Sequence, residues 1–239
     1  MLKNIAFFFL GALVGGVTTY LLGNSPKVVP PEEVNGCEHA DSAAVSDYQG
    51  IDVSNHQDEI SWSDVARDKN IRFVYIKASE GATFKDGRYK ENVKGARKNG
   101  ILVGSYHFIR NTSLIRKQFE NFKSMAAKDE QDLIPMVDVE ERVDKDSILL
   151  FCELVKKHYG RLPMIYGTMG SYNSYCAPDF NSYYLMIGRY SSEPPVIRGK
   201  GHYNIWQYSQ KGKVKGISKY VDLDRFHPDF DLDCLMLKR

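Results

Sequence analysis

From Gly50 onward, short runs of strand-forming residues alternate with helical patterns, and this alternation constrains the fold more than any other feature. The strand-like runs are GIDVS, RFVYIKAS, ILVGSYHFI, LIPMVDVE, LPMIYG, YYLMIGRY, YNIWQYS and YVDLDRF. The helical patterns are WSDVARDK, RYKENVKGARKNG, TSLIRKQFENFKSMAAK, DSILLFCELVKKHYG and a short one near MGSYNSYC. Strands that alternate with helices predict an α/β fold with a parallel sheet built from βαβ units.

The number of strand-like runs favours a closed sheet. We predict an irregular TIM-like (β/α) barrel over residues 47–239, irregular because the last three runs lack full-length helices between them. An open doubly wound sheet is the alternative, but it would carry a G-x-G-x-x-G fingerprint for a dinucleotide, and this is missing. No G-x-x-x-x-G-K-[ST] loop occurs either, so we expect neither nucleotide chemistry nor a cofactor.

The amino-terminal segment, residues 1–23, reads as a membrane segment. Lys3 precedes a run of 18 residues, from Ile5 to Leu22, that holds no charged residue. A membrane-spanning helix needs at least roughly 17 apolar residues, so this run is just long enough. No A-x-A-like cleavage site follows, which favours an uncleaved transmembrane helix over a cleaved signal peptide. Residues 24–46, rich in proline, acidic and small residues, predict a flexible linker.

A membrane anchor at residues 1–23 places the barrel outside the cytoplasm, in the periplasm or at the cell surface. If the segment is cleaved instead, we expect the barrel to be secreted. The formal net charge of +2 gives no electrostatic case for binding nucleic acid.

The cysteines, Cys37, Cys152, Cys176 and Cys234, show no C-x-x-C spacing, and the histidines show no H-x-x-x-H, so we expect no metal site. The cysteines form up to two disulfides or stay as buried thiols, and the sequence leaves both open.

The segment LIPMVDVEE, residues 133–141, places two carboxylates in an otherwise apolar run. Residues i and i+2 of a strand share a face, so Asp138 and Glu140 would point the same way. Two carboxylates on one buried face cost free energy unless the protein uses them.

Other polar residues also follow strand-like runs, where a barrel of this kind carries its active site. They are Asp52, Lys77, Glu80, Tyr106, His107, Asp222 and Asp224. Each has a simpler explanation, such as a helix cap, an ion pair or a turn. If acids from three strands meet at one mouth, however, at least one pKa rises, and a protonated carboxyl beside an ionised one suits glycosidic bond cleavage.

Aromatic residues near the same strand ends could stack on sugars. We predict Tyr106, Tyr166 and Trp206 as walls of the site, although tyrosine and tryptophan also fill barrel cores. We also count Lys77 and Glu80 among the candidate substrate-binding residues.

The motifs GIDVSNHQ, FVYIKASEG, GSYHF, PMVDVEE, IYG, IWQYS and VDLDRF, in this order, resemble those of the glycoside hydrolase family 25 lysozymes, the Chalaropsis-type muramidases. The resemblance runs from about Gly50 to Phe226. It implies an irregular α/β barrel that cleaves the β-1,4 bond between N-acetylmuramic acid and N-acetylglucosamine in peptidoglycan glycan strands. We expect the catalytic domain to be monomeric.

The resemblance also implies roles by position. Glu140 corresponds to the general acid, Asp138 to its partner carboxylate, and Asp52 and Asp222 to supporting acids. Many relatives carry Asn in place of Asp224, which leaves the division of labour between Asp222 and Asp224 open.

Strand geometry leaves the stereochemistry open, and our hypothesis is a retaining route in which the 2-acetamido group of the substrate attacks the anomeric carbon.

Two other functions remain as alternatives. One is a catalytically silent peptidoglycan-binding module, which would be expected to have lost one of the acids. The other is a chitinase-like hydrolase, whose D-G-x-D-x-D-W-E run is absent before Glu140.

Overall fold

The structure is a computed structural model that describes residues 48–237. The predicted membrane segment 1–23 and linker 24–46 lie outside these residues, as does Cys37. Within residues 48–237 no helix combines the length and apolar character needed to cross a bilayer.

The strands form a closed barrel of eight, in which β1 pairs with both β2 and β9. Around the ring they are β1 (Gly50–Val53), β2 (Phe73–Glu80), β4 (Leu102–Phe108), β5 (Met136–Asp138), β6 (Met164–Thr168), β7 (Leu185–Gly188), β8 (Ile205–Gly212) and β9 (Val221–Phe226). The short β3 (Phe84–Lys85) pairs only with β2 and stands outside the ring. The prediction of a barrel rather than an open sheet is confirmed, and each of the eight strand-like runs supplies one strand.

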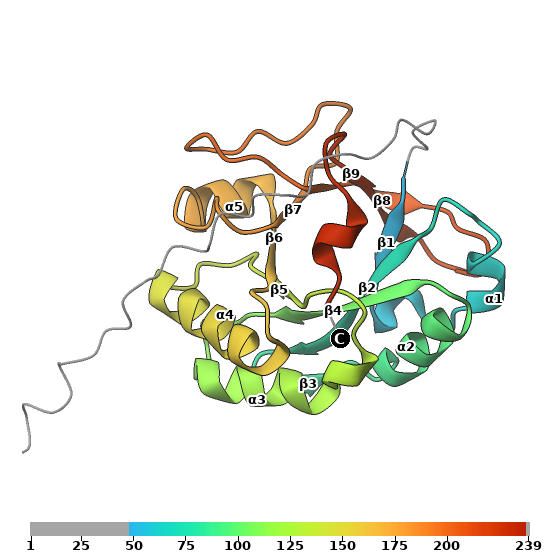
Figure 1. The fold of residues 1–239 in the computed structure, drawn as a ribbon, viewed down its shortest axis with the longest axis horizontal. Coiled ribbons are helices and arrows are strands. Elements are labelled where there is room, and N and C mark those ends of the chain that lie inside the picture. The colour runs from blue at the N-terminus through green and yellow to red at the C-terminus, as the bar shows by residue number, and fades with distance from the viewer. Residues whose placement is uncertain (1–47, 238–239) are drawn as a thin grey trace, which may run out of the picture. The chain divides into compact units, whose positions relative to one another are not determined.

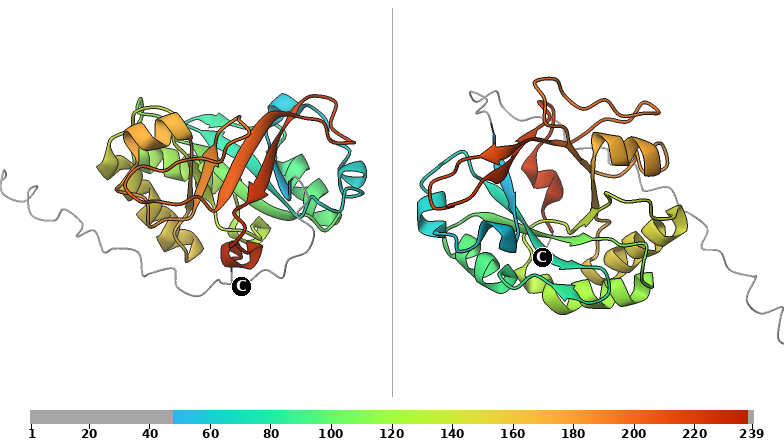
Figure 2. Two further views of the ribbon diagram at one scale, coloured as in Figure 1. Left: turned by 90° about the horizontal axis from the view of Figure 1, so that it is seen from above. Right: turned by 180° about the vertical axis from the view of Figure 1, so that it is seen from behind.

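Helices surround the barrel on the side of its first strands, as Figures 1 and 2 show. The α-helices are α1 (Trp62–Val65), α2 (Tyr89–Lys98), α3 (Ile115–Met125), α4 (Lys145–Tyr159) and α5 (Met169–Tyr175). Short 3-10 helices are η1 (Asn55–Gln57), η2 (Lys128–Glu130) and η3 (Leu232–Leu235). Neither the β7–β8 nor the β8–β9 connection contains a helix, so the barrel is irregular on the side that the sequence indicated.

Helix α4 illustrates how local sequence sets an element's ends. Asp144 caps its start, accepting a hydrogen bond of 2.9 Å from the backbone N–H of Ser147. Gly160 ends it with φ of 92°, a left-handed conformation that costs a residue with a Cβ atom more than it costs glycine.

The direction of β9 corrects the prediction of a parallel sheet. Seven strands run parallel around the ring, but β9 is antiparallel to both of its neighbours, β1 and β8. The connection from β8 to β9 is too short for a crossover, so the chain returns as a hairpin. Strand β9 therefore starts at the end of the barrel where the other strands finish, which places Asp222 near the mouth and Asp224 deeper.

Large side chains fill the barrel interior. Phe73 and Phe226 stack with ring centroids 5.2 Å apart, and the buried Tyr75 donates a hydrogen bond of 3.0 Å to the carbonyl of Ile134. The Tyr75 ring fits because its neighbour is glycine: a Cβ atom on Gly104 would lie 2.3 Å from the ring. The interior is thus a packed core, not a pore.

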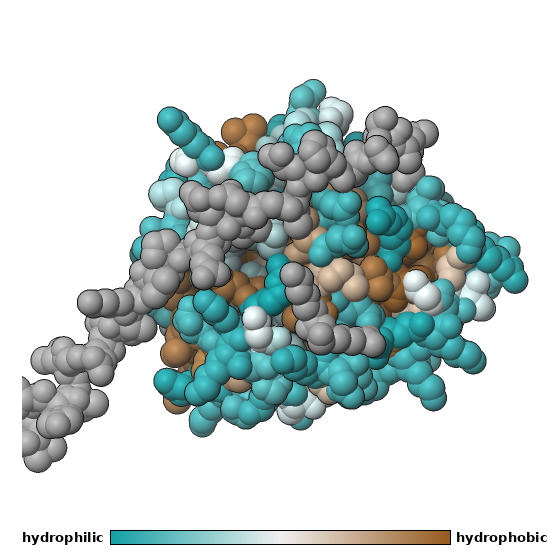
Figure 3. Space-filling model, in the orientation of Figure 1, coloured by the Kyte–Doolittle hydropathy of each residue, from teal (hydrophilic) through white to brown (hydrophobic). Residues whose placement is uncertain are grey.

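Helix η3 covers the amino-terminal ends of the strands and appears as the short red helix in Figure 1. The backbone N–H of Ile134, just before β5, donates to the carbonyl of Leu235. Arg161, before β6, donates to the carbonyls of Cys234 and Met236. In the same orientation, hydrophilic residues dominate the rim of this face and hydrophobic ones gather towards its middle (Figure 3). This end of the barrel is closed, so access to the interior comes from the opposite end.

Two of the four cysteines are buried free thiols: Cys152 in α4 and Cys176 directly after α5. For these two, the alternative of buried thiols is correct. They pack as small apolar residues.

Candidate active site

A cavity of about 200 Å³ opens at the carboxyl-terminal end of the barrel. Its lining includes the four predicted acids and two of the predicted aromatic residues: Asp52, Asp138, Glu140, Asp222, Tyr106 and Tyr166. These residues come from five strands or strand ends, which are widely separated in the sequence. The barrel therefore gathers the acids in one place, as the sequence analysis required.

Backbone pairing sets the positions of the acids. Asp52 in β1 lies directly opposite Asp222 in antiparallel β9, so the two carboxyls lie on the same face of the sheet. Asp138 is the last residue of β5, and Glu140 follows the strand. The backbone N–H of Val139 still bonds to the carbonyl of Tyr166 at 2.9 Å. This contact extends the strand geometry past Asp138 and turns Asp138 and Glu140 towards the same cavity.

A hydrogen-bonded group centred on Gln207 was missed by the sequence analysis. Gln207 Nε2 donates to Asp52 Oδ2 at 2.6 Å. The hydroxyls of Tyr166 and Tyr190 each donate to Gln207 Oε1 at 2.8 Å. All four residues line the cavity. The alternation of inward and outward residues along β8 was the signal that could have indicated Gln207.

That alternation also places Trp206 elsewhere. Trp206 is not among the residues that line the cavity, and only 5% of its surface is exposed. Its ring nitrogen donates to the carbonyl of Arg189 at 2.8 Å, and the Arg225 guanidinium lies 5.0 Å from its ring centroid. Since Gln207 faces inward, its neighbour Trp206 faces outward and packs against the outside of the sheet.

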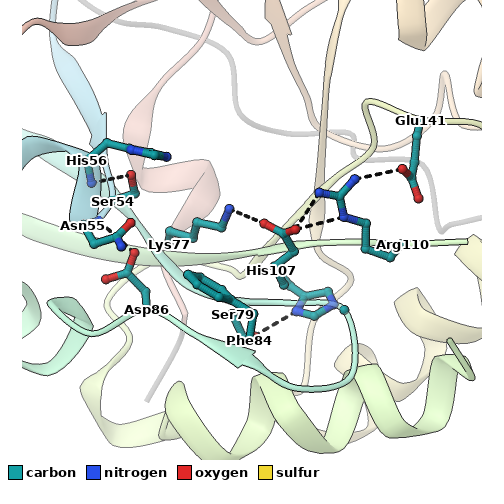
Figure 4. Close-up of polar contacts among 12 residues, drawn as sticks. Ser54, Asn55, His56, Lys77, Ser79, Phe84, Asp86, His107, Arg110 and Glu141 are labelled. Carbon is teal, nitrogen blue, oxygen red and sulfur yellow. Dashed lines mark hydrogen bonds and ion pairs between the residues drawn. The ribbon is translucent and has the colours of Figure 1, made fainter. Parts of the chain in front are cut away.

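Lys77 and Glu80 form an ion pair of 2.7 Å and are likewise absent from the cavity lining. Arg110 binds the other oxygen of Glu80 through two nitrogens, at 2.6 and 2.9 Å, and also pairs with Glu141 at 2.9 Å. Figure 4 labels Lys77, Arg110 and Glu141 and draws their ion pairs as dashed lines. Although these residues do not line the cavity, the positive charge of Lys77 lowers the pKa of both Asp138 and Glu140.

The most buried acids of the cavity have strongly raised pKa values. Burial raises the pKa of Asp52 well above its ordinary value, the charge of Asp222 raises it further, and the bond from Gln207 lowers it. Burial also raises the pKa of Asp138, and the neighbouring Glu140 adds to the shift. Asp138 is 5% exposed, and its Oδ1 has no hydrogen-bond partner among the described residues.

The pKa values of the two acids nearer the solvent, Glu140 and Asp222, are also raised. Partial burial raises the pKa of Glu140, against the opposing charges of Lys77 and Arg110. Burial and the charge of Glu140 raise the pKa of the half-buried Asp222 to about 6. Because like charges in close proximity resist joint ionisation, the cluster keeps protons at a pH where isolated carboxyls would have lost theirs.

Asp224 lies below the cavity and has no exposed surface. Neither of its carboxyl oxygens has a hydrogen-bond partner among residues 48–237. Burial raises its pKa well above the ordinary value, and the charges of Asp52 and Asp222 raise it further. A carboxyl in this setting is stable only when protonated.

His107 lies in the core and not at the cavity. Its ring bonds to Ser79 Oγ at 2.8 Å and to Gln118 Oε1 at 3.2 Å, and it stacks on Phe151 at 4.9 Å. Burial lowers its pKa to about 4, so the ring is neutral at pH 7. Within the described part of the chain, no group of three His, Cys, Asp or Glu residues could hold a metal ion.

Comparisons with known proteins agree with this geometry. The family model "Glycosyl hydrolases family 25" matches residues 51–217. Lysozyme M1 of Streptomyces globisporus is 32% identical over 206 residues, which cover 77% of this chain and 69% of that protein.

Two solved structures are also similar. A family 25 glycosyl hydrolase from Bacillus anthracis superposes with a TM-score of 0.70 at 28% identity, covering 80% of this chain and 94% of the other. The bacterial lysozyme of Streptomyces coelicolor superposes with a TM-score of 0.69 at 31% identity, covering 77% and 94%.

Proposed function

Since this chain belongs to glycosyl hydrolase family 25, we propose that it is a lysozyme that hydrolyses the β-1,4 bond between N-acetylmuramic acid and N-acetylglucosamine in peptidoglycan. The chain is a glycoside hydrolase of the lysozyme type. The observation that carries the specific reaction is the gathering of Asp52, Asp138, Glu140 and Asp222 in one cavity. A cluster that both retains protons and holds negative charge meets the needs of glycosidic cleavage.

Exposure distinguishes the roles of the two central carboxyls. Glu140 is exposed at the cavity, where it can reach a leaving glycosidic oxygen, so we assign it the general acid. Asp138 is buried beneath it and serves as the partner carboxylate. As the substrate covers Glu140 and removes it from water, its protonated form is favoured further. Lys77 lowers the pKa of both carboxyls and so opposes the effect of burial on Asp138.

The reaction proposed is substrate-assisted. The 2-acetamido oxygen attacks the anomeric carbon as Glu140 gives its proton to the leaving oxygen. Asp138 accepts a hydrogen bond from the acetamido N–H and stabilises the positive charge that develops there. Water then opens the cyclic intermediate, with Glu140 as the base that takes the proton of that water. Asp52 and Asp222 lie beside the sugar ring, and Asp222, with a pKa of about 6, supplies negative charge there at pH 7.

Mass spectrometry of fragments released from purified peptidoglycan tests this function. The wild-type protein should release fragments with muramic acid at the reducing end, and reducing ends on glucosamine would contradict the proposal. The variant Glu140→Gln should lower the rate by about 10²- to 10⁴-fold. Glu141→Gln is the matched control, because Glu141 pairs with Arg110 and is not part of the cavity lining.

The same assay separates the alternatives. A silent binding module would bind cell walls without releasing fragments, and Glu140→Gln would bind as the wild type does. A chitinase-like hydrolase would release fragments from chitin oligosaccharides faster than from peptidoglycan.

We also propose that residues 1–23 anchor the domain to a membrane, with the barrel on the outer side. The uncharged run from Ile5 to Leu22 supports this proposal. Amino-terminal sequencing of the protein recovered from membrane and soluble fractions tests it. An intact amino terminus in the membrane fraction is expected, and a soluble protein that begins after residue 23 would favour a cleaved signal.

A further inference from the structure

A second cleft adjoins the acid cavity. It has a volume of about 850 Å³ and lies between η1 and the β8–β9 connection. His56 and Gln57 line both spaces, so the cleft continues the cavity past η1. Its far side is formed by Lys213, Lys219 and Tyr220.

The β8–β9 connection is firmly held, although it contains no helix. Gln57 Nε2 donates to the carbonyl of Tyr220 at 3.1 Å. The Ser61 N–H donates to the carbonyl of Gly216 at 2.8 Å, and Ile60 and Ile217 form an isolated bridge. These contacts fix the cleft wall relative to the cavity, so the cleft is a built feature of the fold.

The cleft has the opposite charge to the cavity. Residues 211–220, KGKVKGISKY, contain four lysines and no acidic residue. Lys213 forms no ion pair with a described residue, and its ammonium lies 5.8 Å from the ring centroid of Tyr220. Lys219 pairs with Asp58 at 2.8 Å through two well-exposed side chains. Lys213 is therefore a cation available to a ligand, beside a Tyr220 ring that is 55% exposed.

A peptidoglycan strand carries anionic groups that the acid cavity would repel. Its stem peptides branch from muramic acid and bear free carboxylates, and a cluster of carboxyls disfavours such groups at close range. The Lys213 ammonium in the adjoining cleft offers these carboxylates a complementary charge, and the exposed Tyr220 ring offers apolar surface to the rest of the stem peptide.

We infer that this cleft is a binding site for the anionic stem peptide of the substrate, with Lys213 and Tyr220 as its recognition residues. The inference rests on the proposed function, since it assigns the cleft to a branch of the same polymer. The protein would then recognise the stem peptide in the cleft as well as the glycan in the acid cavity.

The test compares two forms of peptidoglycan freed of phosphate-containing polymers. One keeps its stem carboxylates, and in the other they are capped as amides with a carbodiimide and excess ammonia. Rates of reducing-end release at low ionic strength are measured for the wild type, Lys213→Gln and Lys215→Gln. Lys215 is the matched control, because it lies on the same connection but does not line the cleft.

For the wild type, capping should raise KM about two- to fivefold, the size expected of one exposed ion pair, with kcat unchanged. Lys213→Gln should show the raised KM on native peptidoglycan and little further change on the capped form. Lys215→Gln should behave as the wild type.

Equal effects of Lys213→Gln on both substrates, or no effect of capping on the wild type, would overturn the inference while leaving the hydrolase intact. Failure of the wild type to release reducing ends from either substrate would instead overturn the proposed function. If Lys215→Gln raised KM as much as Lys213→Gln does, the basic segment would attract the substrate without a specific site in the cleft, and the inference would be wrong.

Discussion

Gln207 Nε2 lies 2.6 Å from Asp52 Oδ2, and this contact joins residues 155 positions apart in the sequence. The amide has a defined orientation because the hydroxyls of Tyr166 and Tyr190 both donate to its oxygen. Its nitrogen faces Asp52 and donates to Oδ2. In this arrangement Oδ2 of Asp52 is the acceptor, so a proton on this carboxyl resides on Oδ1.

The first prediction follows from this orientation. Gln207→Glu replaces the donor with a second acceptor at nearly the same position, so two carboxyls meet at hydrogen-bond distance and must share a proton. The pKa of Asp52 rises further, and kcat at pH 7 should fall at least about tenfold. Because lower pH supplies the shared proton, part of the loss should recover as pH falls. Measuring kcat against pH checks this.

Tyr190→Phe is the milder companion variant, since it removes one of the two donors to Gln207 Oε1 and leaves Tyr166 in place. A kcat loss several times smaller than that of Gln207→Glu is expected. If Gln207→Glu gave the wild-type pH profile, Gln207 would have no influence on Asp52.

The second prediction concerns Asp224 and stability. Its folded-state pKa is raised above the unfolded value, so the native state binds more protons, and the free energy of unfolding falls as pH rises from about 4 towards the folded pKa. Asp224→Asn keeps the shape without the titration. The variant should gain stability over the wild type by up to about 1.4 kcal/mol per pH unit in that window.

Chemical denaturation of both proteins at pH 4, 5.5 and 7 measures the difference. It should be smallest at pH 4, where Asp224 is protonated in the unfolded chain as well. A difference that does not change with pH would show that Asp224 has the same pKa in the folded and unfolded chains, and a variant that becomes less stable than the wild type as pH rises would show that the folded protein favours the ionised carboxylate.

The third prediction uses the influence of Lys77 on the central pair. The Lys77 ammonium lowers the pKa of both Asp138 and Glu140. Lys77→Met removes that charge, and Arg110 still binds Glu80. The pair should then hold its proton to higher pH, so the alkaline limb of the kcat profile should move up by about half a unit to one unit. Lys85→Met, an exposed lysine of β3, should leave the limb in place, and a downward shift in Lys77→Met would contradict the assignment of Glu140 as the acid.

The fourth prediction concerns stereochemistry. A substrate-assisted route inverts the anomeric carbon twice, so the first product from the β-linked sugar should be the β anomer. Proton NMR during the first minutes of digestion identifies it before mutarotation. An initial α anomer would eliminate the assisted route and leave direct attack by water.

Much of the fold was accessible from local patterns. The run GIDVS predicted a strand where β1 lies, and DSILLFCELVKKHYG predicted a helix over α4, because periodicity and capping act within a few residues. The prediction that Asp138 and Glu140 share a face also holds, although β5 itself ends at Asp138.

The residues that local patterns placed less well depend on contacts between distant segments. Trp206 and Gln207 adjoin in sequence, and only the barrel decides which of them faces inward. Asp222 and Asp224 both belong to VDLDRF, and the reversed direction of β9 places the first at the cavity and the second in the core.

The sequence alone determined the number and order of the barrel strands and the candidate acids, because strand propensity, turn residues and charge are properties of short segments. The tertiary structure decided the direction of β9, the depth of Asp224 and the partners of Asp52. These depend on closing β1 against β9 at the end of the chain, and only that closure sets the burial and mutual repulsion that give each carboxyl its protonation state.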